Sequence, residues 1–272
     1  MAAGYGAVII LNKSILDIIT SAGFCRKNYL GREIPAGAGV IFSLGAIAVS
    51  PLFLFALSGS LTEKSAVFLL TLIVYTLLGL MDDCWGDGKS KGFKGHIISL
   101  LEGRPTTGAV KALGGGLAAV YIAALNYAGS GRLAMIPLDA LALALSVNTY
   151  NLLDLRPGRA GKVYLASAAV IILLFSSSPP VVFLALTAGS LAAYLPADLK
   201  GRAMLGDAGA NALGAVMGLS VVWLFNVEAK AVYLLSLAAV NIISEKYSLT
   251  GIIASNRMLN YIDMLGRDRN EN

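Results

Sequence analysis

Long runs of apolar residues, separated by shorter polar segments, occupy most of the 272-residue chain. A helix needs about 20 mostly apolar residues to cross about 30 Å of hydrocarbon, and nine segments approach that length. They lie near residues 3–20, 36–57, 65–81, 108–126, 133–150, 162–177, 180–196, 207–225 and 229–247. The pattern predicts an all-α fold: a polytopic membrane helix bundle of about nine transmembrane helices.

The composition supports a membrane protein and excludes several other classes. Hydrophobic residues make up 57% of the chain and charged residues only 14%, whereas an ordinary soluble domain carries roughly 25% charged residues. This composition excludes a soluble fold, a disordered chain and a disulfide-stapled secreted scaffold. The net charge of +5 does not indicate nucleic acid as a partner, because no basic stripe interleaved with aromatic residues is present.

The distribution of Lys and Arg predicts the orientation. All but four of the 21 basic residues fall in the loops after the first, third, fifth and seventh spans or in the tail. The exceptions are Lys13, inside the first span, and Lys64, Arg132 and Lys230. The positive-inside rule then places the N-terminus outside and the tail in the cytosol. We therefore expect a cell-membrane protein with a single transmembrane catalytic domain, residues 1–247, a cytosolic-face active site and a polar cytosolic tail, residues 248–272.

Two adjacent carboxylates, Asp82 and Asp83, end the third predicted span. Carboxylates at membrane depth are costly and are functional candidates by default. The two repel each other unless a cation lies beside them, and oxygen ligands favour magnesium or manganese. A solvated helix end is the alternative interpretation.

A second polar group, Asn148, Asn151 and Asp154, ends the fifth predicted span. At spacings of three residues these side chains fall on neighbouring faces of a helix and form one polar stripe. The stripe is also compatible with hydrogen bonding between membrane helices. Arg156 and Arg159 follow directly, as expected of a phosphate-binding loop.

A third motif opens the eighth predicted span with Gly206, Asp207 and Gly209. Its small residues permit close approach of a backbone turn, and the N-terminal amides of a helix favour anions. Helix capping by Asp207 is the simpler explanation of this motif taken alone. All three motifs fall on the predicted cytosolic side, so we expect them to form one site.

The three motifs, in this order, resemble those of the polyprenyl-phosphate N-acetylhexosamine-1-phosphate transferases, glycosyltransferase family 4. This family includes phospho-N-acetylmuramoyl-pentapeptide transferase. The resemblance covers residues from about 30 to 225, and the first cytosolic loop, with Arg32 and Pro35, is a looser match. The expected catalytic residues are Asp82, Asp83, Asp154 and Asp207. The expected substrate-binding residues are Lys94, Asn148, Asn151, Arg156, Arg159, Gly206 and Gly209. The expected metal ligands are Asp82, Asp83 and Asp207.

The resemblance implies a reaction. A polyprenyl phosphate attacks the β-phosphate of a UDP-linked N-acetylhexosamine, and the products are the lipid-diphosphate sugar and UMP. Magnesium is the implied cofactor, with manganese as an alternative, and the implied partners are the lipid phosphate, the nucleotide-sugar and the membrane. The resemblance is compatible with a covalent aspartyl intermediate and with direct attack by the lipid phosphate. A homodimer is the implied assembly to test.

Three departures from the family pattern qualify this expectation. The family signature has a second aspartate where this chain has Pro157. The histidine-rich last cytosolic loop is missing, and the single histidine, His96, lies in an earlier loop. The tenth span of the family is replaced by the polar tail.

Two alternative functions follow from these departures and from the fold. The first is a catalytically degraded relative that binds lipid phosphate or nucleotide and regulates envelope synthesis. Retention of the four aspartates argues against it, because idle carboxylates at membrane depth are expensive. The second is a small-molecule transporter, but transporters usually show an internal repeat and a site near the midplane, and neither feature is present.

Overall fold

The computed structural model describes residues 1–56, 60–86, 107–129 and 131–267. Helices dominate it, so the expected helical class is confirmed. The helices are α1 (Ala2–Ser21), α2 (Val40–Ala56), α3 (Ser60–Trp85), α5 (Thr107–Asn126), α6 (Ile136–Leu153), α7 (Arg159–Leu174), α8 (Val181–Leu199), α9 (Gly206–Leu224), α10 (Val227–Lys246), α11 (Leu249–Ser255) and α12 (Arg257–Met264). A short 3-10 turn, η1 (Leu133–Met135), precedes α6.

One small sheet departs from the all-α expectation. Strands β1 (Cys25–Lys27) and β2 (Glu33–Pro35) pair antiparallel between α1 and α2. Asn28 sets the turn between them, because its side-chain oxygen accepts from the backbone N–H groups of Leu30 (2.9 Å) and Arg32 (3.0 Å). Asn is favoured in turns for this ability to bond nearby backbone. The strands are too short for an alternating hydrophobic pattern, which is why the sequence did not predict them.

Seven helices among the described residues are long and apolar enough to cross a membrane. They are α1, α3 from Thr62, α5, the η1–α6 unit, α8, α9 and α10. The other two expected spans correspond to α2, with 17 residues, and α7, with 16, near or below the usual lower limit of about 17. The described residues thus contain seven candidate membrane spans, whereas the count of nine and the orientation stay predictions.

Helix α9 lies at the centre of the bundle and contacts α2, α3, α6, α7 and α8. Every residue from Ala208 to Val222 is buried. Glycines allow this close packing: a Cβ added at Gly214 would lie 2.5 Å from the Cα of Val147, and one at Gly218 would lie 2.9 Å from the Cα of Leu143. Small residues let membrane helices approach in this way, so α9 and α6 pack backbone against backbone.

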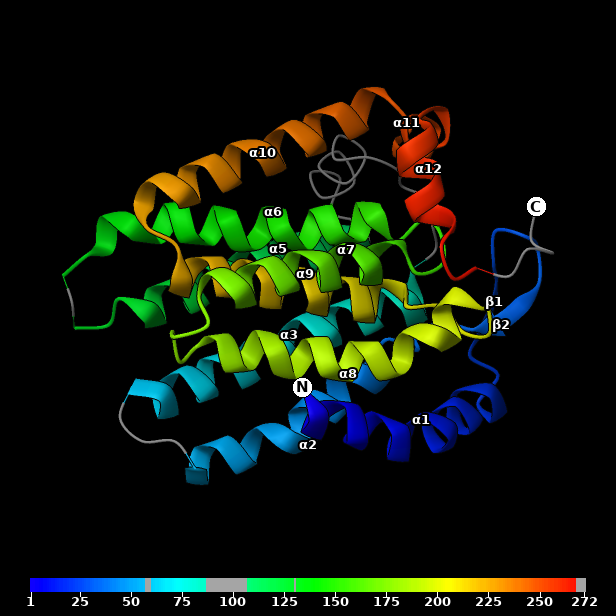
Figure 1. The fold of residues 1–272 in the computed structure, drawn as a ribbon, viewed down its shortest axis with the longest axis horizontal. Helices are drawn as coiled ribbons and strands as arrows, with labels where there is room; N and C mark the ends of the chain where they lie inside the picture. Colours follow the sequence, from blue (N-terminus) through cyan, green and yellow to red (C-terminus); the bar gives the residue numbers. More distant parts are fainter. Residues whose placement is uncertain (57–59, 87–106, 130, 268–272) are drawn as a thin grey trace.

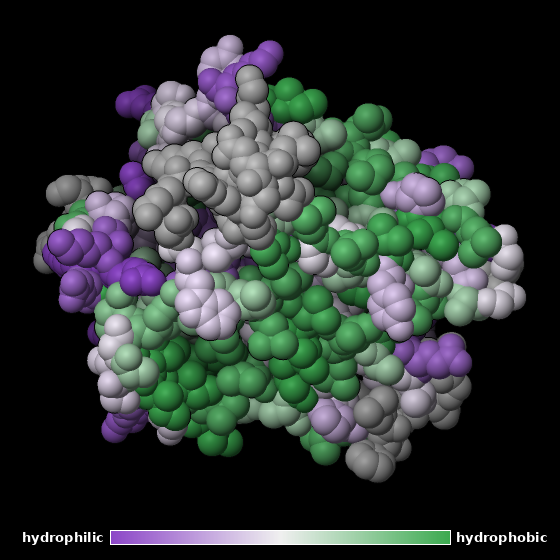
Figure 2. Space-filling model, turned by 180° about the vertical axis from the view of Figure 1, so that it is seen from behind, coloured by the Kyte–Doolittle hydropathy of each residue, from purple (hydrophilic) through white to green (hydrophobic). Residues whose placement is uncertain are grey.

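The two ends of the bundle differ in composition. The β1–β2 hairpin, α11, α12 and the C-terminus gather at one end, on the right in Figure 1. From behind, a broad hydrophobic surface covers the middle of the molecule, and hydrophilic residues gather mainly at that same end, now on the left (Figure 2). The C-terminal ends of α3 and α6 and the N-terminus of α9 also lie there (Figure 1), so the fold brings the three motifs to one end.

Candidate active site

The N-terminus of α9 is bound by a carboxylate from α3. Asp83 accepts hydrogen bonds from the backbone N–H groups of Asp207 (3.0 Å) and Ala208 (2.9 Å). These N–H groups have no partner within the helix, and the helix dipole favours an anion there. Gly206 makes the approach possible: its φ is +69°, and a Cβ on it would lie 2.7 Å from an Asp83 oxygen and 2.9 Å from the Cα of Gly37. Gly206 thus has a structural role, and its contact with substrate stays a prediction.

Two further carboxylates bind the backbone just before Asp207. Asp154, at the end of α6, accepts from the N–H of Gly206. Asp198, near the end of α8, accepts from the N–H of Leu205 and from that of Gly158 (2.8 Å). Burial, and after it the charges of the neighbouring carboxylates, raises the pKa of Asp154 well above its ordinary value. Sequence reasoning missed Asp198, because no motif surrounds it.

Asp82 and Asp207 form a second group around the ammonium of Lys111, which lies in the first turns of α5. Lys111 Nζ makes an ion pair with Asp207 and another, at 3.4 Å, with Asp82. Asn151, in the amide orientation that satisfies both neighbours, donates to Asp207 (2.7 Å) and accepts from Lys111 (2.9 Å). The Thr107 hydroxyl also bonds to Asp82. Residues from the three motifs therefore meet at one lysine that the sequence did not identify as a site residue.

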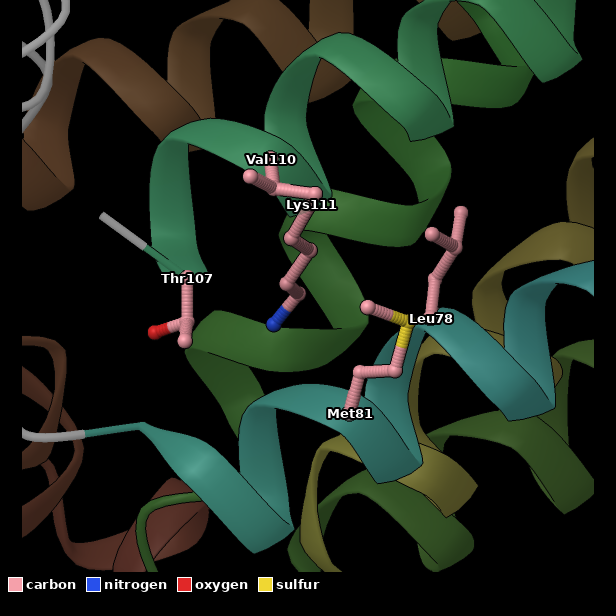
Figure 3. A pocket seen from close by; sticks show the side chains of 5 residues that line it. All are labelled: Leu78, Met81, Thr107, Val110 and Lys111. Carbon is pink, nitrogen blue, oxygen red and sulfur yellow. The ribbon is translucent and has the colours of Figure 1, made fainter. Parts of the chain in front are cut away.

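A small cavity of about 120 Å³ adjoins this group. It lies between α3 and α5 and is lined by Leu78, Met81, Thr107, Val110 and Lys111 (Figure 3). The aliphatic part of the lysine side chain extends across the cavity toward α3 (Figure 3). An apolar wall with an ammonium at its inner side suits an amphiphile that carries a negative headgroup.

In the part of the chain that the structure describes, three carboxylates gather near one ammonium. Lys111 pairs with Asp82 and Asp207, and Asp83 bonds to the backbone of Asp207. Hard oxygen donors of this kind suit magnesium or manganese. The two oxygens of Asp83 already accept backbone N–H groups, and no group of three His, Cys, Asp or Glu side chains in the described ranges has a metal-binding arrangement. The donor set thus fits a divalent ion best at Asp82 and Asp207, and the metal site stays a prediction.

Two other predicted substrate-binding residues lie near this group but contact protein. The Asn148 amide donates to Asn241 of α10, and Asn241 donates in turn to Thr149 (2.9 Å), so Asn148 contributes to helix–helix bonding. The Arg156 guanidinium lies over the Tyr29 ring at 4.7 Å from its centroid, and its Nη1 donates to the backbone carbonyl of Leu155 at 3.2 Å. Substrate contacts by either residue stay predictions.

Arg159 does not face the carboxylates. Its Nε and Nη2 donate to Asp263 at 2.8 and 2.9 Å, and its Nη1 donates to Thr250 at 3.0 Å. Arg159 is also only 4% exposed, so the phosphate binding expected from its place after the signature would require the tail to move away. We therefore infer that Arg159 attaches the tail to the bundle. Its partner Asp263 lies 104 residues away, and no local sequence pattern predicts this contact.

The remaining predicted residues have no established role here. Gly209 packs against the turn before α2, where a Cβ on it would lie 2.9 Å from the Cα of Gly39, and its contact with substrate stays a prediction. Lys94 and His96 lie outside the described residues.

Comparison with models of known protein families gives a match to glycosyl transferase family 4 over residues 65–225, which is more than half of the chain. The matched region begins in α3 and ends after α9, and it includes all three motifs. A comparison with curated proteins gives no match.

Proposed function

We propose a function from one established premise: the chain belongs to glycosyl transferase family 4. The chain transfers a sugar-1-phosphate from a UDP-linked N-acetylhexosamine to a polyprenyl phosphate and releases UMP. The reaction takes place at the cytosolic face of the cell membrane and serves the synthesis of envelope glycans. The premise itself supports the coarser statement, a membrane-bound transferase.

One observation carries this proposal: Asp82 and Asp207, from two different motifs, share the ammonium of Lys111 beside a small apolar cavity. Phosphoryl transfer depends on positioning and on neutralising charge more than on covalent chemistry by the protein. An oxygen of the lipid phosphate forms a new bond to the phosphorus attached to the sugar, and the bond from that phosphorus to UMP breaks. Preorganised cations at such a site stabilise the charge that develops in the transition state.

A divalent ion, when bound, would supply further neutralisation of the diphosphate. Asp82 and Asp207 would hold it, because their carboxylates already gather around a single positive charge. Asp83 instead keeps the α9 N-terminus in place through its two backbone hydrogen bonds. With a metal at these carboxylates, Lys111 would be released from its ion pairs with them, and its ammonium would then bind a phosphate oxygen of either substrate.

The acceptor reaches the site from the membrane side. The cavity opens between α3 and α5, and its wall includes Leu78, Met81 and Val110. Met81 is 40% exposed and Val110 42%, so this opening is continuous with the apolar surface of the bundle. In our proposal the first carbons of the polyprenyl chain lie against this wall, and the phosphate lies toward Lys111.

The test is to incubate the purified protein with polyprenyl phosphate, magnesium and a panel of nucleotide-sugars, and to measure released UMP. We expect UMP from a UDP-linked N-acetylhexosamine, loss of that signal on chelation, and a fall in turnover of about 10²–10³ in Asp207→Asn. Asp17→Asn, an exposed carboxylate on α1, is the matched control. Undiminished turnover after chelation and in Asp207→Asn would refute the metal-assisted mechanism. Binding of lipid phosphate or nucleotide with no UMP from any mixture would favour the degraded relative.

A further inference from the structure

The C-terminal segment, residues 248–267, folds back on the start of α7 through buried charges. Asp263 is 7% exposed and Arg159 is 4% exposed. The two form a two-pronged ion pair, with the Arg159 Nε and Nη2 atoms on the two carboxylate oxygens at 2.8 and 2.9 Å. Arg267 adds a third bond to the same carboxylate at 2.9 Å. Two parallel hydrogen bonds of this kind fix the relative orientation of the two side chains and also strengthen the contact between them.

Lys162 binds the backbone at the same, C-terminal end of α12. Its ammonium donates to the backbone carbonyl groups of Ile262 (2.9 Å), Asp263 and Leu265 (3.1 Å). These are carbonyl groups at a helix C-terminus, which lack partners in the helix and attract a cation. Burial alone raises the pKa of Asp263, but the hydrogen bonds and charge of Arg159 hold that pKa below its ordinary value. The carboxylate is therefore ionised in this contact.

The same segment also touches the turn that follows Asp154. Arg267 Nε donates to the backbone carbonyl of Pro157 at 2.9 Å. On the other side of this turn, Asp198 accepts from the N–H of Gly158, whose φ is +71°. Inside this turn, the backbone N–H of Asp154 bonds back to the carbonyl of Tyr150 in α6, and that of Arg159 bonds to the carbonyl of Arg156, both at 3.2 Å. The side-chain contacts from α8 and from the tail add to these backbone bonds in fixing Pro157 and Gly158.

We propose that the C-terminal segment is a positioning element for the 154–158 turn: Asp263 and Arg267 clamp the turn against Asp198 and thereby hold the Asp154 carboxylate at the N-terminus of α9. Arg267 acts as a positioning residue through Pro157, and Asp263 orients Arg267 and Arg159 together. The expected effect on turnover rests on the transferase function proposed above. The contact by which the C-terminal segment holds the 154–158 turn does not depend on that function.

The first measurement is hydrogen exchange on the full-length protein. In Asp263→Asn we expect backbone exchange to rise by about tenfold, as for local opening, both in residues 257–267 and in residues 154–162. Arg267→Lys keeps the charge but lacks the fork that reaches both Pro157 and Asp263, and we expect the same rise in residues 154–162 in a variant that folds normally. Arg257→Met, an exposed residue of the same helix, is the control and should change neither segment.

The second measurement is steady-state kinetics of the same variants. A displaced Asp154 should lower kcat by about tenfold to a hundredfold, as small misplacements do, and leave the KM for the lipid acceptor unchanged. Faster exchange confined to residues 257–267, with residues 154–162 unchanged, would overturn the proposal, and so would an unchanged kcat in variants whose turn has loosened. If the wild-type protein releases no UMP at all, the proposed function fails, and the exchange data alone still decide the coupling.

Discussion

At the scale of single residues, the position of Lys111 determines whether the site can hold two carboxylates so close together. Lys111 is the cation that Asp82 and Asp207 both contact in the described part of the chain. Without it, like charges would face each other in a partly buried site, and such charges raise each other's energy. We therefore expect this residue to be as sensitive to substitution as the aspartates.

For Lys111→Met we expect turnover to fall by about 10²–10³, the cost of removing one preorganised charge from a transition state. The measurement is UMP release at saturating lipid phosphate and nucleotide-sugar. Lys200→Met removes an exposed lysine from the same end of the bundle and should leave turnover unchanged. A loss smaller than about tenfold at Lys111 would mean that another cation neutralises the pair.

Pro157 leads to a prediction about the donor. It lies where the family signature has a second aspartate, and its side chain can neither accept nor donate a hydrogen bond. Its carbonyl is already bound to Arg267. We therefore expect the nucleobase to be read loosely, with discrimination weaker by about 1.5–3 kcal/mol, the value of a charge-assisted hydrogen bond, or one to two decades.

The check is a competition between UDP-, TDP- and GDP-linked forms of the accepted sugar. Comparable use of the three donors, within about one or two decades, is the expected result. A uridine preference greater than about a thousandfold, which corresponds to roughly 4 kcal/mol, would show that another residue makes the base contact.

At the scale of elements, the site depends on how closely α3 approaches α9. Gly79 of α3 lies against the start of α9, and a Cβ on it would be 2.2 Å from the carbonyl oxygen of Asp207. Backbone atoms cannot rotate away, so the helices must separate. Gly116 of α5 has no atom within 4 Å of the same added carbon, which makes it a matched glycine in a helix interior.

We expect Gly79→Ala to destabilise the protein by about 1–3 kcal/mol through overpacking and to reduce turnover, because Asp207 moves with α9. Gly116→Ala should be neutral or stabilising by up to about 1 kcal/mol, since alanine is the better helix former. Thermal unfolding in detergent measures the first effect and UMP release the second. Equal unfolding temperatures in the two variants would contradict this account of the α3–α9 contact.

The helices could be predicted from the sequence, but the contacts between them could not. Apolar length predicted the principal helices, and the polar residues at their ends predicted that the three motifs would lie at one end of the bundle. The distant partners of these residues could not be predicted: Asp83 bonds to the backbone of Ala208, 125 positions away, and Lys111 lies 96 positions from Asp207. A repeat of 3.6 residues indicates which face of a helix is buried, but not which helix covers that face.

The same limit applies to the tail. Its composition predicted a polar tail and no particular contact with the bundle, whereas α12 places Asp263 beside Arg159. Asp263, between Ile262 and Met264, belongs to no motif that would indicate a buried ion pair, because its partner is supplied by the fold. Arg159 was predicted to bind substrate phosphate, but its position after a signature motif gave no means of distinguishing an internal ion pair from a phosphate contact.

At the scale of the whole molecule, the separation of charge between the two ends bears on where the reaction occurs. The described basic residues of the hairpin, of the turn before α7 and of the tail lie at the end that carries the carboxylate site. The opposite end has Lys64, Arg132 and Lys230, and Lys230 is buried in an ion pair with Asp139 at 2.8 Å. The excess of exposed positive charge at the site end is the bias that the positive-inside rule associates with the cytosol.

This bias gives the last prediction, that the end of the bundle away from the site lies outside and the C-terminal segment lies in the cytosol. Ala128, after α5, and Ala254 are exposed and suit single cysteine substitutions after Cys25 and Cys84 have been changed to serine. A membrane-impermeant thiol reagent should label Ala128→Cys in intact cells and Ala254→Cys only after permeabilisation, because we expect the two positions on opposite sides of the bilayer. Labelling of Ala254→Cys in intact cells would reverse the orientation. It would also place the carboxylate site on the side away from cytosolic nucleotide-sugars, and the proposed donor would then have no access to Asp82 and Asp207.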